Sequence, residues 1–332
     1  MAICKIFDPY PKSSREEFFD NYEVLDNLEK LLEGKFWPLI IGPKRTGKTS
    51  ILKIVGKELN GIYIDATGIK SLKGLADNLI SSLTYRVQLD LKVLKVEVTK
   101  RPVKGLQSLL GKLGDTVVLI DEVQNIISPW FISFLSNAYN NSEVRFAFSG
   151  SMIGLSKTLT GKGKGKFKGR PIVQIETTPF SEEVGKEFLR YGSRECGVKI
   201  SEGEIEDAVE TYRGIQGWLT YYGNFRSLGY PHDKAKDMVS QIASNIIEGE
   251  VESLGEIQKL IVKALTMVEE IRWKDLKNLA ESVGKREISD WSFNHALMQL
   301  VDARLVKVVN DGSKKYSLID PMYKYIIQRK GW

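Results

Sequence analysis

The chain has 332 residues, of which 42% are hydrophobic and 27% charged, and this is enough for two or three globular domains with cores of their own. No apolar run approaches the length that crosses a membrane, and the first ten residues contain no signal-peptide core, so we expect a cytoplasmic protein. Two distant cysteines, Cys4 and Cys196, do not make a disulfide framework or a metal cluster, and we expect both thiols to be buried and structural.

The net charge of +6 comes from one stretch. Residues 157–170, which start at Lys157 and end at Arg170, hold six basic residues and no acidic one, so the rest of the chain is neutral. Glycines alternate with lysines there, which predicts a flexible segment. It is either a solvated surface loop or a clamp for the phosphate backbone of duplex DNA, and the sequence leaves both open.

The first 35 residues predict an arm followed by a helix. Prolines punctuate residues 8–11, and Ser14 with Glu17 matches a capping box at the start of a helix. Leucines then recur at helical spacing until Gly34, where we expect that helix to end.

Residues 42–49 carry the most informative motif, G-x-x-x-x-G-K-[ST]. Its members are Gly42, Pro43, Lys44, Arg45, Thr46, Gly47, Lys48 and Thr49. An apolar run at 36–41 predicts a buried strand before it, and Ser50 opens an apolar helical pattern after it. The glycines let the backbone wrap around phosphates at a helix N-terminus, where Lys48 reaches the β- and γ-phosphates and the Thr49 hydroxyl can bind Mg²⁺. The sequence therefore predicts a nucleotide-phosphate site.

A second anchor lies at the end of another buried strand. Residues 61–65 predict a strand, residues 72–83 an amphipathic helix, and residues 93–98 an additional short strand. Four apolar residues then lead into Asp121 and Glu122, at the strand end where ligands collect in open α/β sheets. Asp121 would hold Mg²⁺, directly or through water, and Glu122 would orient and deprotonate the attacking water.

The strand predicted at 144–148 ends in Ser149. If this strand lies beside the phosphate-loop strand, Ser149 would lie near the γ-phosphate; a simple Ser-Gly turn is the alternative. Residues 172–176 predict a fifth strand, and Ser181 opens a helix with acidic residues in its first turn.

Beyond residue 192 the strand pattern stops, and helical patterns follow. Ser201 and Glu204 match a capping box, and residues 214–219 interrupt the helices. Residues 253–332 then predict three helices and a β-hairpin with a turn at 310–312, the element order of a winged helix.

The winged-helix segment is not strongly basic. It holds 14 Lys and Arg against 10 Asp and Glu, and its predicted recognition helix, residues 289–303, includes Asp290 and Asp302. Packing or dimerisation is therefore as compatible with this segment as DNA binding is.

With these landmarks in place, the chain resembles the archaeal ATPase family within the STAND and Orc/Cdc6-related P-loop ATPases. The motifs that carry the resemblance are Phe18-Phe19-Asp20, residues 42–49, 119–122, 149–151, 169–170, 179–181 and 214–219. It implies an α/β fold of the ASCE type, with a five-stranded parallel sheet in which the Ser149 strand separates the other two motif strands. It implies three parts: an ATPase core at 1–192, a helical lid at 193–252 and a winged helix at 253–332.

The resemblance also implies the ligands. An adenine nucleotide, ATP or ADP with Mg²⁺, would bind between the core and the lid, with Phe19 and Gln216 as further contacts and Arg170 as a γ-phosphate sensor. The chain departs from the family pattern at Asn21-Tyr22, where Arg-Glu is usual, and at residues 213–216, where Gly-Gly-x-Pro is usual.

Two functions follow. The first is a slow, Mg²⁺-dependent ATPase that works as a nucleotide-controlled switch, with a protein partner or self-association left open. The alternative is a DNA-binding regulator or initiator-like protein in which the nucleotide is mainly structural, with DNA held by residues 157–170 and the winged helix.

Overall fold

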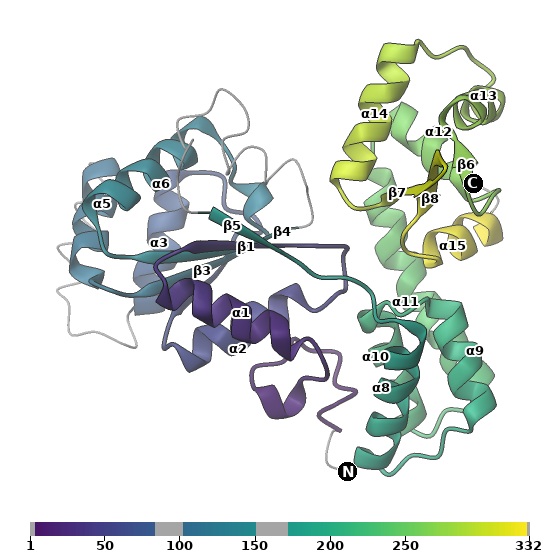
Figure 1. Cartoon of the computed structure of the whole chain (residues 1–332), viewed down its shortest axis with the longest axis horizontal. Coiled ribbons are helices and arrows are strands. Elements are labelled where there is room, and N and C mark those ends of the chain that lie inside the picture. The colour runs from purple at the N-terminus through teal and green to yellow at the C-terminus, as the bar shows by residue number, and fades with distance from the viewer. Residues whose placement is uncertain (1–3, 84–101, 151–171, 331–332) are drawn as a thin grey trace. The chain divides into compact units, whose positions relative to one another are not determined.

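A computed structural model of the chain describes residues 4–83, 102–150 and 172–330 (Figure 1). By its internal contacts the chain forms two compact units. The sheet unit comprises Pro11–Gly42 and Gly47–Thr177, and the helical unit comprises Met1–Tyr10, Pro43–Thr46 and Thr178–Trp332. The division into three domains expected from the sequence stays a prediction.

The sheet unit is built on five parallel strands in the order β2-β3-β4-β1-β5. They are β1 (Trp37–Ile41), β2 (Ile62–Asp65), β3 (Val117–Asp121), β4 (Arg145–Gly150) and β5 (Ile172–Glu176). Ile40 pairs with Ser149, and Asp65 pairs with Asp121. The strand of Ser149 therefore lies between the strand of Asp121 and the phosphate-loop strand, which confirms the predicted order.

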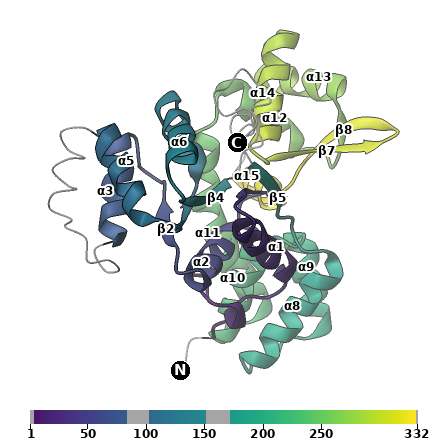
Figure 2. The same cartoon turned by 60° about the vertical axis from the view of Figure 1, so that its left-hand side comes forward.

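Helices cover both faces of this sheet. They are α1 (Tyr22–Glu33), α2 (Lys48–Glu58), α3 (Leu72–Leu83), α5 (Pro102–Leu113) and α6 (Pro129–Asn141), with short 3-10 helices η1 (Arg15–Glu17) and η2 (Val123–Asn125). Helices α1 and α2 lie on one face, and α3, α5 and α6 lie on the other (Figures 1 and 2). Because side chains alternate along a strand, each face receives every second residue, and both sets are apolar.

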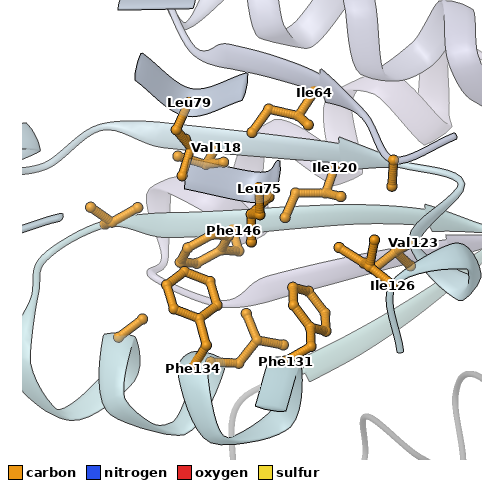
Figure 3. Packing of buried hydrophobic residues seen from close by; sticks show 14 of the residues in the cluster. Ile64, Leu75, Leu79, Val118, Ile120, Val123, Ile126, Phe131, Phe134 and Phe146 are labelled. Carbon is orange, nitrogen blue, oxygen red and sulfur yellow. The ribbon is translucent and has the colours of Figure 1, made fainter. Parts of the chain in front are cut away.

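Aromatic rings fill the layer between α6 and the sheet. Phe131 and Phe134 of α6 point toward Phe146 of β4, and Phe134 meets Phe146 edge to face at 6.0 Å between ring centroids (Figure 3). Burying one such side chain contributes roughly 1.5–3 kcal/mol. This packing fixes the strands, and with them the loops at their carboxyl ends where the motif residues lie.

One local prediction for this unit is wrong. Ser14 makes no cap hydrogen bond, and only the three-residue η1 follows it. The chain leaves the helical conformation at Phe18, whose φ of −105° and ψ of 133° are extended. The Arg15 guanidinium forms ion pairs with Asp26, Glu29 and Glu58. Helix α5 was not among the predicted elements.

The helical unit begins with four helices and ends with a mixed segment. Its elements are α8 (Glu182–Glu195), α9 (Glu202–Tyr212), α10 (Gln216–Ser227), α11 (His232–Glu252), α12 (Glu256–Leu265), β6 (Ile271–Arg272), α13 (Trp273–Gly284), α14 (Asp290–Asp302), β7 (Val306–Asp311), β8 (Ser313–Leu318) and α15 (Met322–Lys330). The predicted capping box of α9 is present: Glu204 N donates to Ser201 Oγ, and Ser201 N donates to the Glu204 carboxylate at 2.7 Å.

The last segment contains the predicted three helices and hairpin. The hairpin of β7 and β8 is longer than the pattern indicated, and only Gly312, with a left-handed φ of 64°, separates its strands. It extends away from α12, α13 and α14 (Figure 2). A third strand, β6, and the final helix, α15, were not predicted. Among the described residues, no helix is long and apolar enough to cross a membrane.

The expectation of two buried thiols is wrong. Cys4 and Cys196 form a disulfide with 5.3 Å between their Cα atoms, and both are only half-buried. Phe7 explains how residues so distant in sequence meet. Its ring is fully buried against Gly192 of α8 and Gly223 of α10, where any Cβ would overlap it. The N-terminal arm is thereby held beside the end of α8, where Cys196 is the C-cap.

This disulfide closes a loop with a sequence separation of 192. Restricting the unfolded chain to that extent is worth up to about 5 kcal/mol in the chain-entropy account. We therefore expect a thiol-free phosphine reductant to lower the guanidinium midpoint of the parent protein and to leave that of a Cys4→Ser variant unchanged. Equal midpoints for the parent with and without reductant would contradict this expectation.

Candidate functional site

The first glycine of the phosphate loop is fixed by a neighbouring strand end. Gly42 follows β1, and a Cβ built on it would overlap the hydroxyl and carbonyl oxygens of Thr177. Thr177 in turn donates its N–H to the carbonyl of Ile41 at 2.8 Å. Only glycine fits this close approach, so Gly42 is required by the packing of β1 against the end of β5, as well as by the phosphate-binding geometry expected from the motif.

The second glycine begins the helix. Gly47 is the N-cap of α2 with a left-handed φ of 83°, and the ring of Phe18 lies beside it. Lys48 follows and is buried, with Nζ donating to the carbonyl of Gly42 at 3.1 Å. The ammonium group therefore folds back over the mouth of the loop, where phosphate oxygens would replace the carbonyl as its acceptor.

Asp121 is the hydrogen-bonding centre of the site. Thr49 Oγ1 donates to its Oδ2 at 2.7 Å, and the Tyr63 hydroxyl donates to the same oxygen at 2.9 Å. Ser149 Oγ and, at 3.0 Å, the N–H of Glu122 donate to Oδ1. A carboxylate offers about four lone-pair positions. The four donors therefore hold this buried side chain in one orientation.

Glu122 leaves the strand in an unusual backbone conformation. Its φ of 50° and ψ of 40° are left-handed, so the chain turns sharply after Asp121. Gln124 Nε2 donates to the Glu122 carboxylate, which orients it. Residues in such backbone conformations cluster at functional sites, where the surrounding packing holds them in place.

The middle of the loop, Pro43–Thr46, belongs to the helical unit. Arg45 has a left-handed φ of 65°, and its guanidinium pairs with Glu250 at 2.8 Å and Asp320 at 3.4 Å. It also lies over the ring of Trp218, 4.4 Å from the centroid. Lys44 Nζ is 3.1 Å from Glu250. The two basic residues of the loop are therefore fixed by acidic groups of α11 and of the turn before α15.

The two carboxylates respond differently to Arg45. Burial alone would raise the pKa of Glu250, but Arg45, Lys44 and the hydroxyl of Tyr323 outweigh it, so the pKa is lowered. Burial dominates at Asp320 and raises its pKa, although Arg45 opposes the shift. The difference follows from burial and from Lys44, because Asp320 is buried while Glu250 is half-buried and also pairs with Lys44.

The remaining predicted contacts are placed as follows. Ser50 Oγ accepts a hydrogen bond from Lys12 N at 3.0 Å, and Phe19 is half-buried. Gln216 opens α10 and donates its Nε2 to the carbonyl of Thr178 at 2.9 Å, while its Oε1 is buried without a partner among the described residues.

Several predictions lie outside the described residues. They are Arg170 as a γ-phosphate sensor, the basic run at 157–170, Ser151 and the strand at 93–98.

The chain departs from the family pattern at residues 213–216, but its backbone still requires a glycine at Gly214. Gly214 has a φ of 73°, and a Cβ there would overlap the carbonyl of Phe180, whose N–H donates to the Gly214 carbonyl at 2.9 Å. The turn into α10 is thus determined by this backbone approach, without the proline that the family pattern places nearby.

Mg²⁺ fits the donors that are present. Thr49 and Asp121 present hydroxyl and carboxylate oxygens side by side, the ligand type that this ion prefers. In the part of the chain that the structure describes, no group of three His, Cys, Asp or Glu side chains could hold a metal without other ligands. Mg²⁺ commonly takes one or two protein oxygens and completes its shell with phosphates and water.

Three parts of this site were missed by the sequence analysis: Tyr63, Thr177 and the Glu250–Asp320 pair. Strand alternation puts Tyr63 on the same face as Asp65, which pairs with Asp121, and this is a weak available signal. The sequence carries no signal for Asp320, which lies 275 positions from Arg45.

A strand–loop–helix with a buried lysine, joined through its threonine to a carboxylate two strands away, is the arrangement of the P-loop nucleoside triphosphatases. Similarity to known proteins assigns the chain to a family within this class. A family described as an ATPase domain predominantly from Archaea matches residues 18–222, and the chain belongs to this family.

Two solved structures are similar over nearly the whole chain. A Walker-type ATPase of Pyrococcus abyssi has 26% identity and a TM-score of 0.85, with 97% of this chain and 99% of that chain covered. The ORC2 protein of Aeropyrum pernix, solved as ADPNP–ADP complexes, has 15% identity and a TM-score of 0.67, with 98% of both chains covered, and it shares the fold. A search of curated proteins gave no match.

The packing around Gly42 predicts a stability effect. Gly42→Ala forces a Cβ into the oxygens of Thr177 and should lower the free energy of unfolding by about 1–3 kcal/mol. Gly111→Ala is the matched control, because Gly111 of α5 faces open space and alanine there should stabilise by about 0.5–1 kcal/mol. Guanidinium unfolding measures both, and a Gly42→Ala variant as stable as the parent would show that β1 and β5 separate easily at this point.

Proposed function

We propose that the chain is an ATP-binding, Mg²⁺-dependent and slowly hydrolysing ATPase that works as a nucleotide-controlled switch. Membership of the ATPase family supports nucleotide binding. The observation that carries the switch is the ion pairing of Lys44 and Arg45, two phosphate-loop residues, with Glu250 and with Asp320.

Phosphate binding would use the loop as it is folded. The α2 N-terminus offers N–H groups and the positive end of the helix dipole, and Lys48 adds the one cation buried at the mouth of the loop among the described residues. The family resemblance implies Gln216 as a further nucleotide contact, and this stays a prediction.

Hydrolysis would depend on Glu122. The left-handed turn after Asp121 carries its carboxylate off the strand end, and Gln124 orients it as a base for the attacking water. Mg²⁺, when bound, would neutralise charge on the β- and γ-phosphates. Ser149 Oγ donates to Asp121 from the end of the neighbouring strand, β4, and would contact the γ-phosphate there.

The switch follows from the position of Arg45. Phosphates would bind to loop amides on both sides of a residue whose backbone is left-handed and whose side chain is held by Glu250, Asp320 and Trp218. The carbonyl of Arg45 also accepts the N–H of Gly217 at the start of α10 at 3.0 Å. A change of loop conformation on gain or loss of the γ-phosphate would thus act on α10 and α11 directly.

DNA binding stays a prediction from sequence, as does the winged helix as its carrier. The first residues of α14 are Asp290 and the exposed Trp291, and Asp302 ends the helix. This surface does not favour a phosphate backbone over a protein partner.

Lys48→Ala is expected to weaken ATP binding by about 100-fold or more, because the phosphates lose a buried charge-assisted donor. Calorimetry with Lys57→Ala as the control, an exposed lysine on the same helix, measures the effect. Unchanged affinity in Lys48→Ala would remove the phosphate-loop assignment.

Glu122→Gln should bind ATP like the parent and hydrolyse it about 100-fold more slowly or worse, since an amide cannot accept the proton of water. Single-turnover hydrolysis at saturating enzyme separates this step from product release. Glu143→Gln, which neutralises an exposed carboxylate just before β4, is the control. If turnover in Glu122→Gln stays within twofold of the control, another group is the base.

A further inference from the structure

Tyr63 occupies a place in the site that the motifs do not account for. Its hydroxyl donates to Oδ2 of Asp121, the oxygen that also accepts the hydrogen bond of Thr49. The opposite oxygen is held separately, by Ser149 and by the N–H of Glu122. Tyr63 is therefore one of only two donors on Oδ2 among the described residues.

The strand register explains why a tyrosine reaches this point. Tyr63 pairs with Leu119 on β3, two residues before Asp121 on the same face. To reach the Asp121 carboxylate, the side chain at position 63 must extend toward the carboxyl end of β2, past the Ile64–Ile120 pair. A tyrosine side chain is long enough to do so. Its ring packs against the core cluster under α2, and Lys53 Nζ of that helix lies 5.2 Å from its centroid.

The Tyr63 hydroxyl is the donor in this bond, because a phenol carries its proton at neutral pH and an ionised carboxylate can only accept.

The two donors on Oδ2 are not equivalent in function. Thr49 would itself become a ligand of Mg²⁺, so its position depends on the ion that Asp121 helps to bind. Tyr63 is anchored independently, in the core and on β2. Outer partners of this kind commonly change metal affinity by about 10- to 100-fold when removed.

We infer that Tyr63 is a positioning residue that holds the Asp121 carboxylate for Mg²⁺ in the nucleotide complex. The inference rests on the proposed function, because the ion would bind together with the phosphates of ADP or ATP. Tyr63 does not touch the nucleotide in this assignment, so it should affect the ion and leave nucleotide binding without metal unchanged.

The test compares Tyr63→Phe with the parent in two titrations of the full chain. Calorimetry with ADP in EDTA measures the phosphate loop alone, and we expect affinities within twofold of each other. Titration of the ADP complex with Mn²⁺, followed by the electron paramagnetic resonance of free Mn²⁺, measures metal affinity without turnover. Here we expect about a 10-fold loss in Tyr63→Phe, and competition with Mg²⁺ extends the result to that ion.

Tyr230→Phe is the matched control, because it deletes the same hydroxyl group from a tyrosine of the helical unit. The ring of Tyr230 packs edge-on against Phe225. Thermal unfolding of the metal-free variants reports whether each is folded. If Tyr63→Phe binds ADP normally and takes up Mn²⁺ as tightly as the control or more tightly, the positioning role is wrong and the hydroxyl only supports the fold. A parent protein that bound no ADP in either titration would instead overturn the proposed function, and this inference with it.

Discussion

The Arg45 guanidinium pairs with two carboxylates, the half-buried Glu250 and the buried Asp320, and Lys44 pairs with Glu250 as well. A buried carboxylate without a nearby cation is strongly unfavourable. Trp218 lies against the Arg45 guanidinium and donates Nε1–H to Asp320 at 2.9 Å. A left-handed conformation costs a non-glycine residue about 1–2 kcal/mol, which these contacts offset. The shape of the loop between Gly42 and Gly47 thus depends on residues 205 and 275 positions away.

The phosphate loop is divided between the two units. Gly42, Lys48, Thr49 and Asp121, the residues proposed to bind phosphate and Mg²⁺, belong to the sheet unit. The residues between the two glycines belong to the helical unit, so binding of phosphate and packing of α10 and α11 share the same short segment. In the proposed switch, a loop built in this way would report which nucleotide it holds, and slow turnover would let each state last.

Local patterns predicted most of the fold. Apolar runs predicted the five strands and the Ser201–Glu204 spacing predicted the capping box of α9, because these signals lie within a few residues of each other. The order of the strands came from the family resemblance. The disulfide, the partners of Arg45 and the reach of Tyr63 to Asp121 were not predictable in the same way. Each joins segments that only the completed fold brings together. The Ser14–Glu17 spacing did not produce a capping box, because the chain becomes extended at Phe18 after three residues of 3-10 helix.

In the proposed switch, nucleotide acts on the helical unit through Arg45. Amide hydrogen exchange of α10 and α11, compared with and without a non-hydrolysable ATP analogue, measures this directly in the parent and in Arg45→Ala, once calorimetry has shown that both bind the analogue. We expect a change in exchange on binding in the parent that is lost, or reduced severalfold, in Arg45→Ala. An equal change in both proteins, or none in the parent, would contradict it.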